Sequence, residues 1–227
     1  MTALNALAFR TAAVARAFVP GLLALSLLTA TAQASLLAPG VTTLAVGEVE
    51  PGPSKIEDTL TVPVTAATFT GSLTSTVLSG DATNPFGGLT FIYDLSNDAG
   101  SPHAIHRFTV SNFTGFLTDV SYSLPPQGPP VGVVPTLMDR GPLPGDVVGF
   151  TFVGLPLGAG ALAPGSFATT LVIQTDATSW TRSKAAVING STANVDALAP
   201  RAIPEPGTAA MALIGAALSG FWYWRRR

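Results

Sequence analysis

The chain contains no cysteine, only two histidines and few charged side chains. Charged residues make up 11% of its 227 residues, whereas 47% are hydrophobic. The absence of cysteine excludes disulfides, thiolate metal ligands and a cysteine nucleophile. Two histidines also leave little material for general acid–base catalysis or for zinc sites. The composition therefore points away from the commonest kinds of catalytic and metal centre.

A helical hydrophobic period is also lacking between residues 35 and 200. Hydrophobic residues there alternate with polar ones in short stretches, which is typical of antiparallel strands with one buried face. The predicted buried faces comprise Leu60, Val62 and Val64; Leu89, Phe91, Tyr93 and Leu95; Phe108 and Val110; Val148, Phe150 and Phe152; and Phe167, Thr169, Leu171 and Ile173. About eight such strands predict an all-β fold, a single β-sandwich-like domain over residues 35–200.

Turn-forming residues separate the predicted strands. The chain has 23 glycines and 19 prolines, and many of them gather at residues 96–102, 125–130 and 155–165. These segments are predicted loops, since proline cannot donate to a strand ladder. Asn189-Gly190 favours a tight hairpin turn.

Basic residues are scarce in the predicted domain. Twelve acidic side chains between residues 35 and 200 stand against five basic ones, an excess of seven negative charges. An acidic exterior disfavours binding to nucleic acid. We therefore predict no nucleic-acid partner.

Residues 1–34 have the three parts of a secretory signal peptide. Two arginines form the basic region, residues 17–29 the apolar region, and Ala32 and Ala34 the small residues of a cleavage site. The alternative is a first transmembrane helix, but this apolar region is too short to cross a bilayer and is interrupted by a Pro-Gly pair. We expect export by the general secretion machinery and cleavage by signal peptidase after Ala34.

A short linker, residues 201–207, precedes the last apolar segment and contains Pro204, Glu205 and Pro206. Two prolines hold the chain extended and remove helical hydrogen bonds. An extended segment of this kind is accessible to a processing enzyme.

The apolar segment at residues 208–224 carries no charge, and Arg225, Arg226 and Arg227 follow it. As a helix it would span about 25 Å, the lower limit for a bilayer core of about 30 Å. Three arginines favour the cytoplasmic side. We therefore predict a transmembrane helix at residues 208–224 and a cytoplasmic basic tail at residues 225–227, with the β-rich domain outside the inner membrane. An ordinary C-terminal anchor is the alternative.

The Pro-Glu-Pro motif, the apolar segment and the basic end together resemble a PEP-CTERM sorting signal of bacterial envelope proteins. The resemblance implies that an exosortase-type membrane enzyme recognises Pro204, Glu205 and Pro206. It also implies a transient inner-membrane anchor, processing near the motif, and delivery to the cell surface or to extracellular polysaccharide. Residues 91–116 and 171–178 resemble, more loosely, domains that commonly precede such a tail, and this likeness brings no catalytic residues.

The two histidines, His103 and His106, are the first candidates for chemistry. Three residues apart in a strand entry, they would face opposite sides, and a metal would need a further ligand such as Asp94 or Asp98. Solvent-exposed turn histidines are the commoner case. Ser101 lies two residues before His103, but the chain has no nucleophile-elbow motif.

The acidic residues give weak patterns as well. Asp94, Ser96 and Asp98 have part of the spacing of a calcium loop, but Ala99 stands where glycine is needed and no bidentate glutamate follows. A glycosidase needs two carboxylates across a cleft, and the acidic residues here are scattered. We therefore predict no enzymatic activity, no catalytic residue, no metal ligand and no cofactor.

Aromatic side chains outside the clear strand cores could stack against sugar rings. The candidates are Trp180, Tyr122 and Phe116, and core packing is the commoner role for each. The sequence thus predicts an exported structural or interaction protein at the cell surface or in extracellular polysaccharide. The alternative is a carbohydrate- or calcium-dependent binding module that acts as an adhesin.

Overall fold

The computed structural model describes residues 36–153 and 160–201, which form twelve β-strands and no helix. The all-β prediction is confirmed for these residues, although the strands outnumber the eight expected. The described residues contain no helix with the length and hydropathy needed to cross a membrane. The predicted signal peptide with Ala32 and Ala34, the sorting motif, the apolar segment and the terminal arginines lie outside the described residues.

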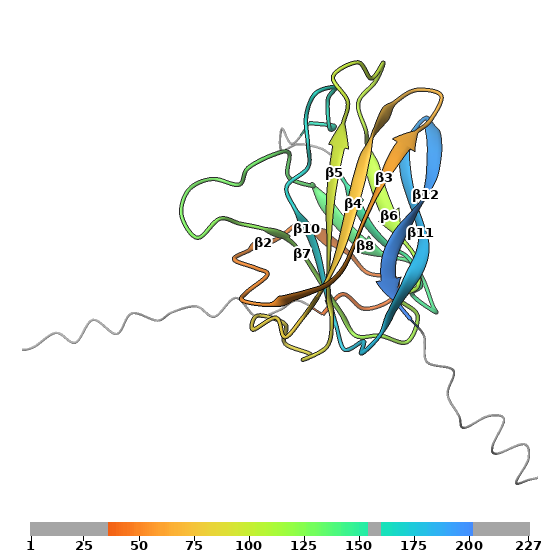
Figure 1. Cartoon of the computed structure of the whole chain (residues 1–227). Helices are drawn as coiled ribbons and strands as arrows, with labels where there is room; N and C mark the ends of the chain where they lie inside the picture. Colours follow the sequence, from red (N-terminus) through yellow and green to blue (C-terminus); the bar gives the residue numbers. More distant parts are fainter. Residues whose placement is uncertain (1–35, 154–159, 202–227) are drawn as a thin grey trace, which may run out of the picture. The chain divides into compact units, whose positions relative to one another are not determined.

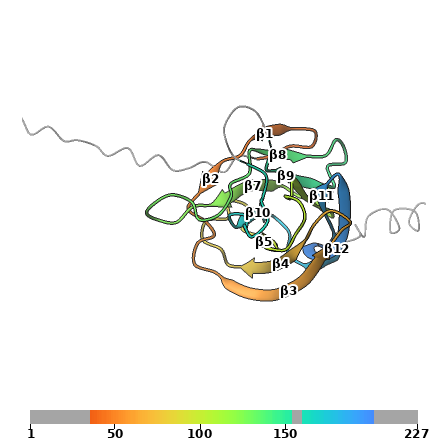
Figure 2. The ribbon, with the colours of Figure 1, turned by 90° about the horizontal axis from the view of Figure 1, so that it is seen from above.

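The strands form two six-stranded sheets (Figures 1 and 2). Sheet A has the order β2 (Gly47–Glu48), β7 (Thr118–Ser123), β10 (Leu171–Thr175), β5 (Thr90–Asn97), β4 (Thr70–Ser79) and β3 (Lys55–Thr65). Sheet B has the order β1 (Thr42–Leu44), β8 (Leu137–Arg140), β9 (Val148–Thr151), β6 (Arg107–Val110), β11 (Trp180–Asn189) and β12 (Ser191–Pro200). Neighbouring strands are antiparallel except β2 and β7, which are parallel.

One hydrophobic core lies between the two sheets. Tyr93 of β5 shows how it is built: its ring lies 5.3 Å from that of Phe108 in sheet B, and its hydroxyl donates to the carbonyl of Leu198 at 2.8 Å. Burying an aromatic ring and bonding its hydroxyl lets one side chain join both sheets. The predicted buried faces of β5, β6 and β9 are confirmed, with Phe91, Val110 and Phe150 fully buried. In β3, Val64 is fully buried, whereas Leu60 and Val62 are partly buried against the core.

The predicted tight turn at Asn189-Gly190 is also confirmed. It joins β11 to β12, with Asn189 paired to Ser191, and Gly190 has a φ of 63°. Glycine adopts this left-handed conformation without steric cost. The hairpin carries β12 against β3 and β4 of the other sheet, so it covers one side of the core.

Alternate residues of sheet A point away from the core and form its outer face. Val120 of β7 is in the core, so Asp119 and Ser121 lie on the outer face. By the same alternation, the outer face carries Gln174 of β10 and both Thr90 and Asp94 of β5. Thr90 and Asp94 are about 13 Å apart along the strand. The two sites described next lie at these two positions.

Candidate functional site

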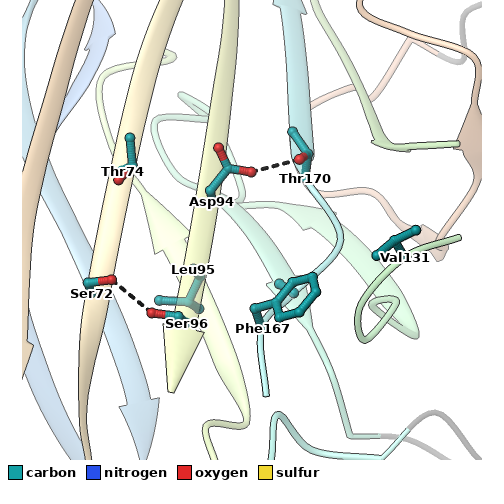
Figure 3. A pocket seen from close by; sticks show the side chains of 9 residues that line it. Ser72, Thr74, Asp94, Leu95, Ser96, Val131, Phe167 and Thr170 are labelled. Carbon is teal, nitrogen blue, oxygen red and sulfur yellow. Dashed lines mark hydrogen bonds between the residues drawn. The ribbon is translucent and has the colours of Figure 1, made fainter. Parts of the chain in front are cut away.

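A groove crosses the outer face of sheet A where β4 and β5 meet the segment before β10 (Figure 3). Its volume is about 400 Å³. Ser72 and Thr74 come from β4, and Asp94 and Ser96 come from β5, where the register places Thr74 opposite Asp94 and Ser72 opposite Ser96. The remaining lining residues are Leu95, Val131, Phe167, Ala168 and Thr170.

Hydrogen bonds fix the polar side chains of the groove. The hydroxyl of Thr170 donates to Oδ1 of Asp94 at 2.6 Å, and the hydroxyls of Ser72 and Ser96 lie 2.8 Å apart (Figure 3). A carboxylate has more acceptor positions than this one bond uses. Asp94, which is exposed, therefore remains able to accept from a ligand hydroxyl.

Phe167 is the large apolar side chain beside these polar groups, and 50% of it is exposed. Backbone hydrogen bonds hold its segment on two sides. Val133 N–H donates to the Phe167 carbonyl at 2.9 Å, and Ala168 N–H donates to the Leu95 carbonyl at 2.8 Å. The prediction that Phe167 shares a buried face with Leu171 is wrong. Strand β10 begins only at Leu171, so the strand alternation does not extend back to Phe167.

Three carboxylates lie together at the other position on this face. Glu48 ends β2, Glu50 follows it by two residues, and Asp119 lies in the neighbouring strand β7. One carboxylate oxygen from each lies within 4.8 Å of the others. Glu48 is half-buried, whereas Glu50 is 5% exposed and Asp119 is 1% exposed. We call Glu48, Glu50 and Asp119 the carboxylate cluster.

Two members of the carboxylate cluster, Glu48 and Glu50, have raised pKa values. Burial raises the pKa of Glu50 to about 8, and the charges of Glu48, Asp119 and Asp81 add to the effect. Burial also raises the pKa of Glu48, again with a contribution from Asp119. Without a cation, Glu50 therefore holds a proton at neutral pH. The hydroxyl of Ser121 donates to Oε1 of Glu50.

Asp81 behaves differently although it lies nearby and is buried. Burial acts to raise its pKa, but hydrogen bonds from Thr90, Thr83 and the Gly52 N–H lower it overall. Its Oδ2 accepts from Thr90 at 2.7 Å and from Gln174 Nε2 at 3.1 Å, while Oδ1 accepts from Gly52 N–H at 2.8 Å. Asp81 thus ties the segment after Glu50 to the sheet.

The histidines do not form a metal centre with carboxylates among the described residues, whose candidate group of three ligands is the carboxylate cluster. His103 and His106 line one shallow pocket with Asn189. The expectation that they face opposite sides of a strand is wrong, because β6 begins only at Arg107. Ser101 is buried and its hydroxyl donates to the His103 carbonyl at 3.1 Å, so it serves the turn.

The acidic residues that suggested a calcium loop lie in two different places in the structure. Asp94 belongs to the groove, where it accepts from Thr170. Asp98 is exposed in the turn after β5, where its N–H donates to the Thr70 carbonyl at 3.0 Å. Neither belongs to the candidate metal group of the described residues.

The predicted sugar-stacking aromatics pack mostly inward. Trp180, Tyr122 and Phe116 are partly buried against the core. Trp180 begins β11, and its indole N–H donates to Asp58 at 3.1 Å. Core packing, the commoner role, is confirmed for the three.

Residues 202–227 match the family model described as the PEP-CTERM protein-sorting motif. This range contains Pro204, Glu205 and Pro206 and the terminal Arg225, Arg226 and Arg227. No match was found among curated proteins or among solved structures. The resemblance predicted from the tail is confirmed: the chain carries a PEP-CTERM protein-sorting motif, the C-terminal signal of secreted proteins that an exosortase processes.

Proposed function

We propose that the chain is an exported structural or interaction protein that presents its β-rich domain outside the inner membrane. The match of residues 202–227 to a protein-sorting motif carries this proposal. The general secretion machinery and signal peptidase act on residues 1–34. Residues 208–224 then hold the chain in the membrane until an exosortase-type enzyme processes it near residues 204–206. The product joins the cell surface or extracellular polysaccharide.

Binding rather than catalysis suits the described domain. Ser101, the candidate nucleophile, is held by the turn backbone, and Asp94 lies in an open groove. Ser101 therefore serves the structure of the turn, and Asp94 serves recognition. The two histidines, which are the candidate general bases, line a different pocket. We therefore propose no enzymatic activity.

The sorting role is tested by replacing Pro204, Glu205 and Pro206 together with alanine in the native host. We expect the variant to remain at full length in the membrane fraction, whereas the unmodified chain is processed and delivered outside. The matched control replaces Pro125, Pro126 and Pro129, three prolines of the loop after β7. Unchanged processing and delivery of the Pro-Glu-Pro variant, measured by mass spectrometry of cell-surface material, would overturn the proposal.

A second function, carbohydrate binding, is supported by the groove. A half-exposed phenylalanine ring offers a flat apolar face for the C–H groups of a sugar, and Asp94 and the nearby hydroxyls can bond its hydroxyl groups. The observation that carries it is the pairing of Phe167 with Asp94 in one groove (Figure 3). This groove replaces Trp180 as the proposed contact surface.

Glycan-array binding of the full-length chain tests this second function. We expect binding to an extracellular polysaccharide to be lost in Phe167→Ala and kept in Leu143→Ala, because Leu143 is 85% exposed but lies outside the groove. Binding that survives Phe167→Ala would remove the groove from consideration. Because no sorting step is involved, this result would leave the sorting proposal intact.

A further inference from the structure

A buried amide side chain from β10 lies beside the carboxylate cluster. Gln174 is paired with Asp119 in the antiparallel register, so the two side chains lie side by side on the outer face of sheet A. Only 1% of Gln174 is exposed. Its Nε2 donates to Asp81 at 3.1 Å and to Thr83 at 2.9 Å.

The amide oxygen of Gln174 is the observation that points to a ligand. Oε1 accepts no hydrogen bond from any described residue, although it is buried. Nε2 faces Asp81, which follows β4 and accepts from Thr90 of β5. The oxygen and nitrogen of an amide point apart, and the neighbour of β10 on the side away from β5 is β7 with Asp119, so we infer that Oε1 faces the carboxylate cluster. A positively charged or proton-donating group between a buried carbonyl oxygen and neighbouring carboxylates would stabilise them.

We propose that Glu48, Glu50, Asp119 and the Gln174 amide oxygen bind one calcium ion. Carboxylate and amide oxygens are the ligands that calcium takes in proteins, with water completing a shell of six to eight. The set contains no nitrogen or sulfur ligand, which disfavours zinc. This site is separate from the acidic turn at Asp94 and Asp98 and goes beyond the sorting and carbohydrate-binding functions proposed above.

Coordination chemistry favours calcium over magnesium. Calcium–oxygen distances of about 2.3–2.6 Å place opposite ligands up to about 5 Å apart, whereas magnesium at about 2.0–2.1 Å places them about 4 Å apart. The three carboxylate oxygens lie within 4.8 Å of one another, close enough to share one ion. Magnesium also demands near-ideal octahedral geometry and gives up its water reluctantly. Glu48 and Glu50 lie two residues apart around a backbone bend, and calcium accepts such irregular geometry more readily than magnesium does.

Bound calcium would join three strands of the sheet through side chains alone. Strand β2 has two residues and lies at the edge of sheet A, next to β7 and then β10. Its ladder to β7 consists of the pairs Gly47–Tyr122 and Glu48–Ser123. A cation held by Glu48, Glu50, Asp119 and Gln174 would therefore fasten this short edge strand, so calcium is expected to stabilise the folded domain.

The test uses the full-length chain purified in detergent and stripped with EDTA. Isothermal titration calorimetry with calcium chloride should show one site per chain with a Kd of about 1 mM or tighter, and calcium should raise the thermal unfolding midpoint. Glu50→Gln and Asp119→Asn should each weaken binding at least about tenfold. Both substitutions keep the shape of the side chain, and cooperative unfolding in EDTA shows that each variant is folded.

Asp98→Asn is the matched control, since it removes an exposed carboxylate from the turn after β5, outside both the groove and the carboxylate cluster. It should bind calcium as the unmodified chain does. Absence of calcium binding by the unmodified chain, or unchanged binding by both Glu50→Gln and Asp119→Asn, would overturn the site. Magnesium binding as tight as calcium binding would overturn the assignment of the ion.

Discussion

Arg140 buries a positive charge at one side of β7, whereas the carboxylate cluster gathers negative charge at the other. Thr118 and Asp119 mark the two sides, because neighbouring residues of a strand point in opposite directions. The Thr118 hydroxyl accepts from Arg140 Nη1 at 2.9 Å, while Asp119 belongs to the cluster. The two buried sites thus meet at adjacent residues of one strand.

Arg140 is satisfied by the protein itself. It is 4% exposed, and its donors bond the Thr118 hydroxyl and four carbonyls, those of Leu37, Phe113, Phe116 and Gly145. Five bonds match the five N–H donors of a guanidinium. Glu50 in contrast receives one side-chain bond, from Ser121, and lies beside two further carboxylates. A charge with a complete set of protein partners is structural, whereas crowded like charges leave a place for a ligand.

The largest effect is expected from Arg140→Met, which removes the charge and its donors but keeps a long side chain. Four carbonyls and the Thr118 hydroxyl each lose a hydrogen bond from a buried guanidinium, so the free energy of unfolding should fall by about 3–5 kcal/mol. Urea denaturation of the full-length chain measures the loss. It should be the same in calcium and in EDTA, because Arg140 is not a ligand of the cluster.

Arg182→Met is the control for this substitution. Arg182 is exposed on β11, so the change should stay within about 0.5 kcal/mol. A loss at Arg140 no larger than at Arg182 would mean that the five hydrogen bonds of the Arg140 guanidinium do not stabilise the fold.

The two sites also show how far the sequence can be interpreted. Alternation along β5 and β6 predicted Phe91 and Phe108 as core residues, because a strand pattern is local and repeats every two residues. The carboxylate cluster was not predicted, since Glu48 and Asp119 are 71 residues apart and meet only through the parallel pairing of β2 with β7. The scattered acidic residues gave no spacing signal for that contact.

The groove was missed for a related reason. Phe167 was predicted to be buried because it continued the alternation of Leu171 and Ile173. The segment instead leaves the ladder, with Phe167 making an isolated bridge to Ser96. In the sequence, Pro164 and Gly165 were the available sign that regular strand structure does not reach Phe167.

The second-largest effect is a pH dependence of the free energy of unfolding, which comes from Glu50 of the carboxylate cluster and is measured in EDTA. The pKa of Glu50 is about 8 in the folded chain, above its ordinary value of 4.5. Below about pH 4.5 both states are protonated, so this stabilising contribution is complete there. As pH rises toward 8, the unfolded state loses the proton first, and the free energy of unfolding should fall by about 1.4 kcal/mol per pH unit. Above about pH 8 the loss is complete.

Urea denaturation in EDTA between about pH 6 and about pH 8 should therefore show a loss of about 2 kcal/mol. Glu50→Gln should flatten this slope because the amide does not titrate, although Glu48, whose pKa burial also raises, will retain part of it. Asp98→Asn, at an exposed turn position, should keep the whole slope. Stability that rises with pH over this range would contradict the assignment of the proton to Glu50.

The smallest effect is expected from Thr118→Val, which tests whether the two sides of β7 act independently. Thr118 is fully buried, and its hydroxyl accepts from Arg140 and donates to the Leu37 carbonyl at 3.1 Å. Thr118→Val removes both bonds with little change of shape, so the free energy of unfolding should fall by about 1–2 kcal/mol. Calcium affinity should stay unchanged, whereas Asp119→Asn, one residue along, should lower it. A calcium Kd that moves as much in Thr118→Val as in Asp119→Asn would show that the strand as a whole, rather than its outer side chains, determines cation binding.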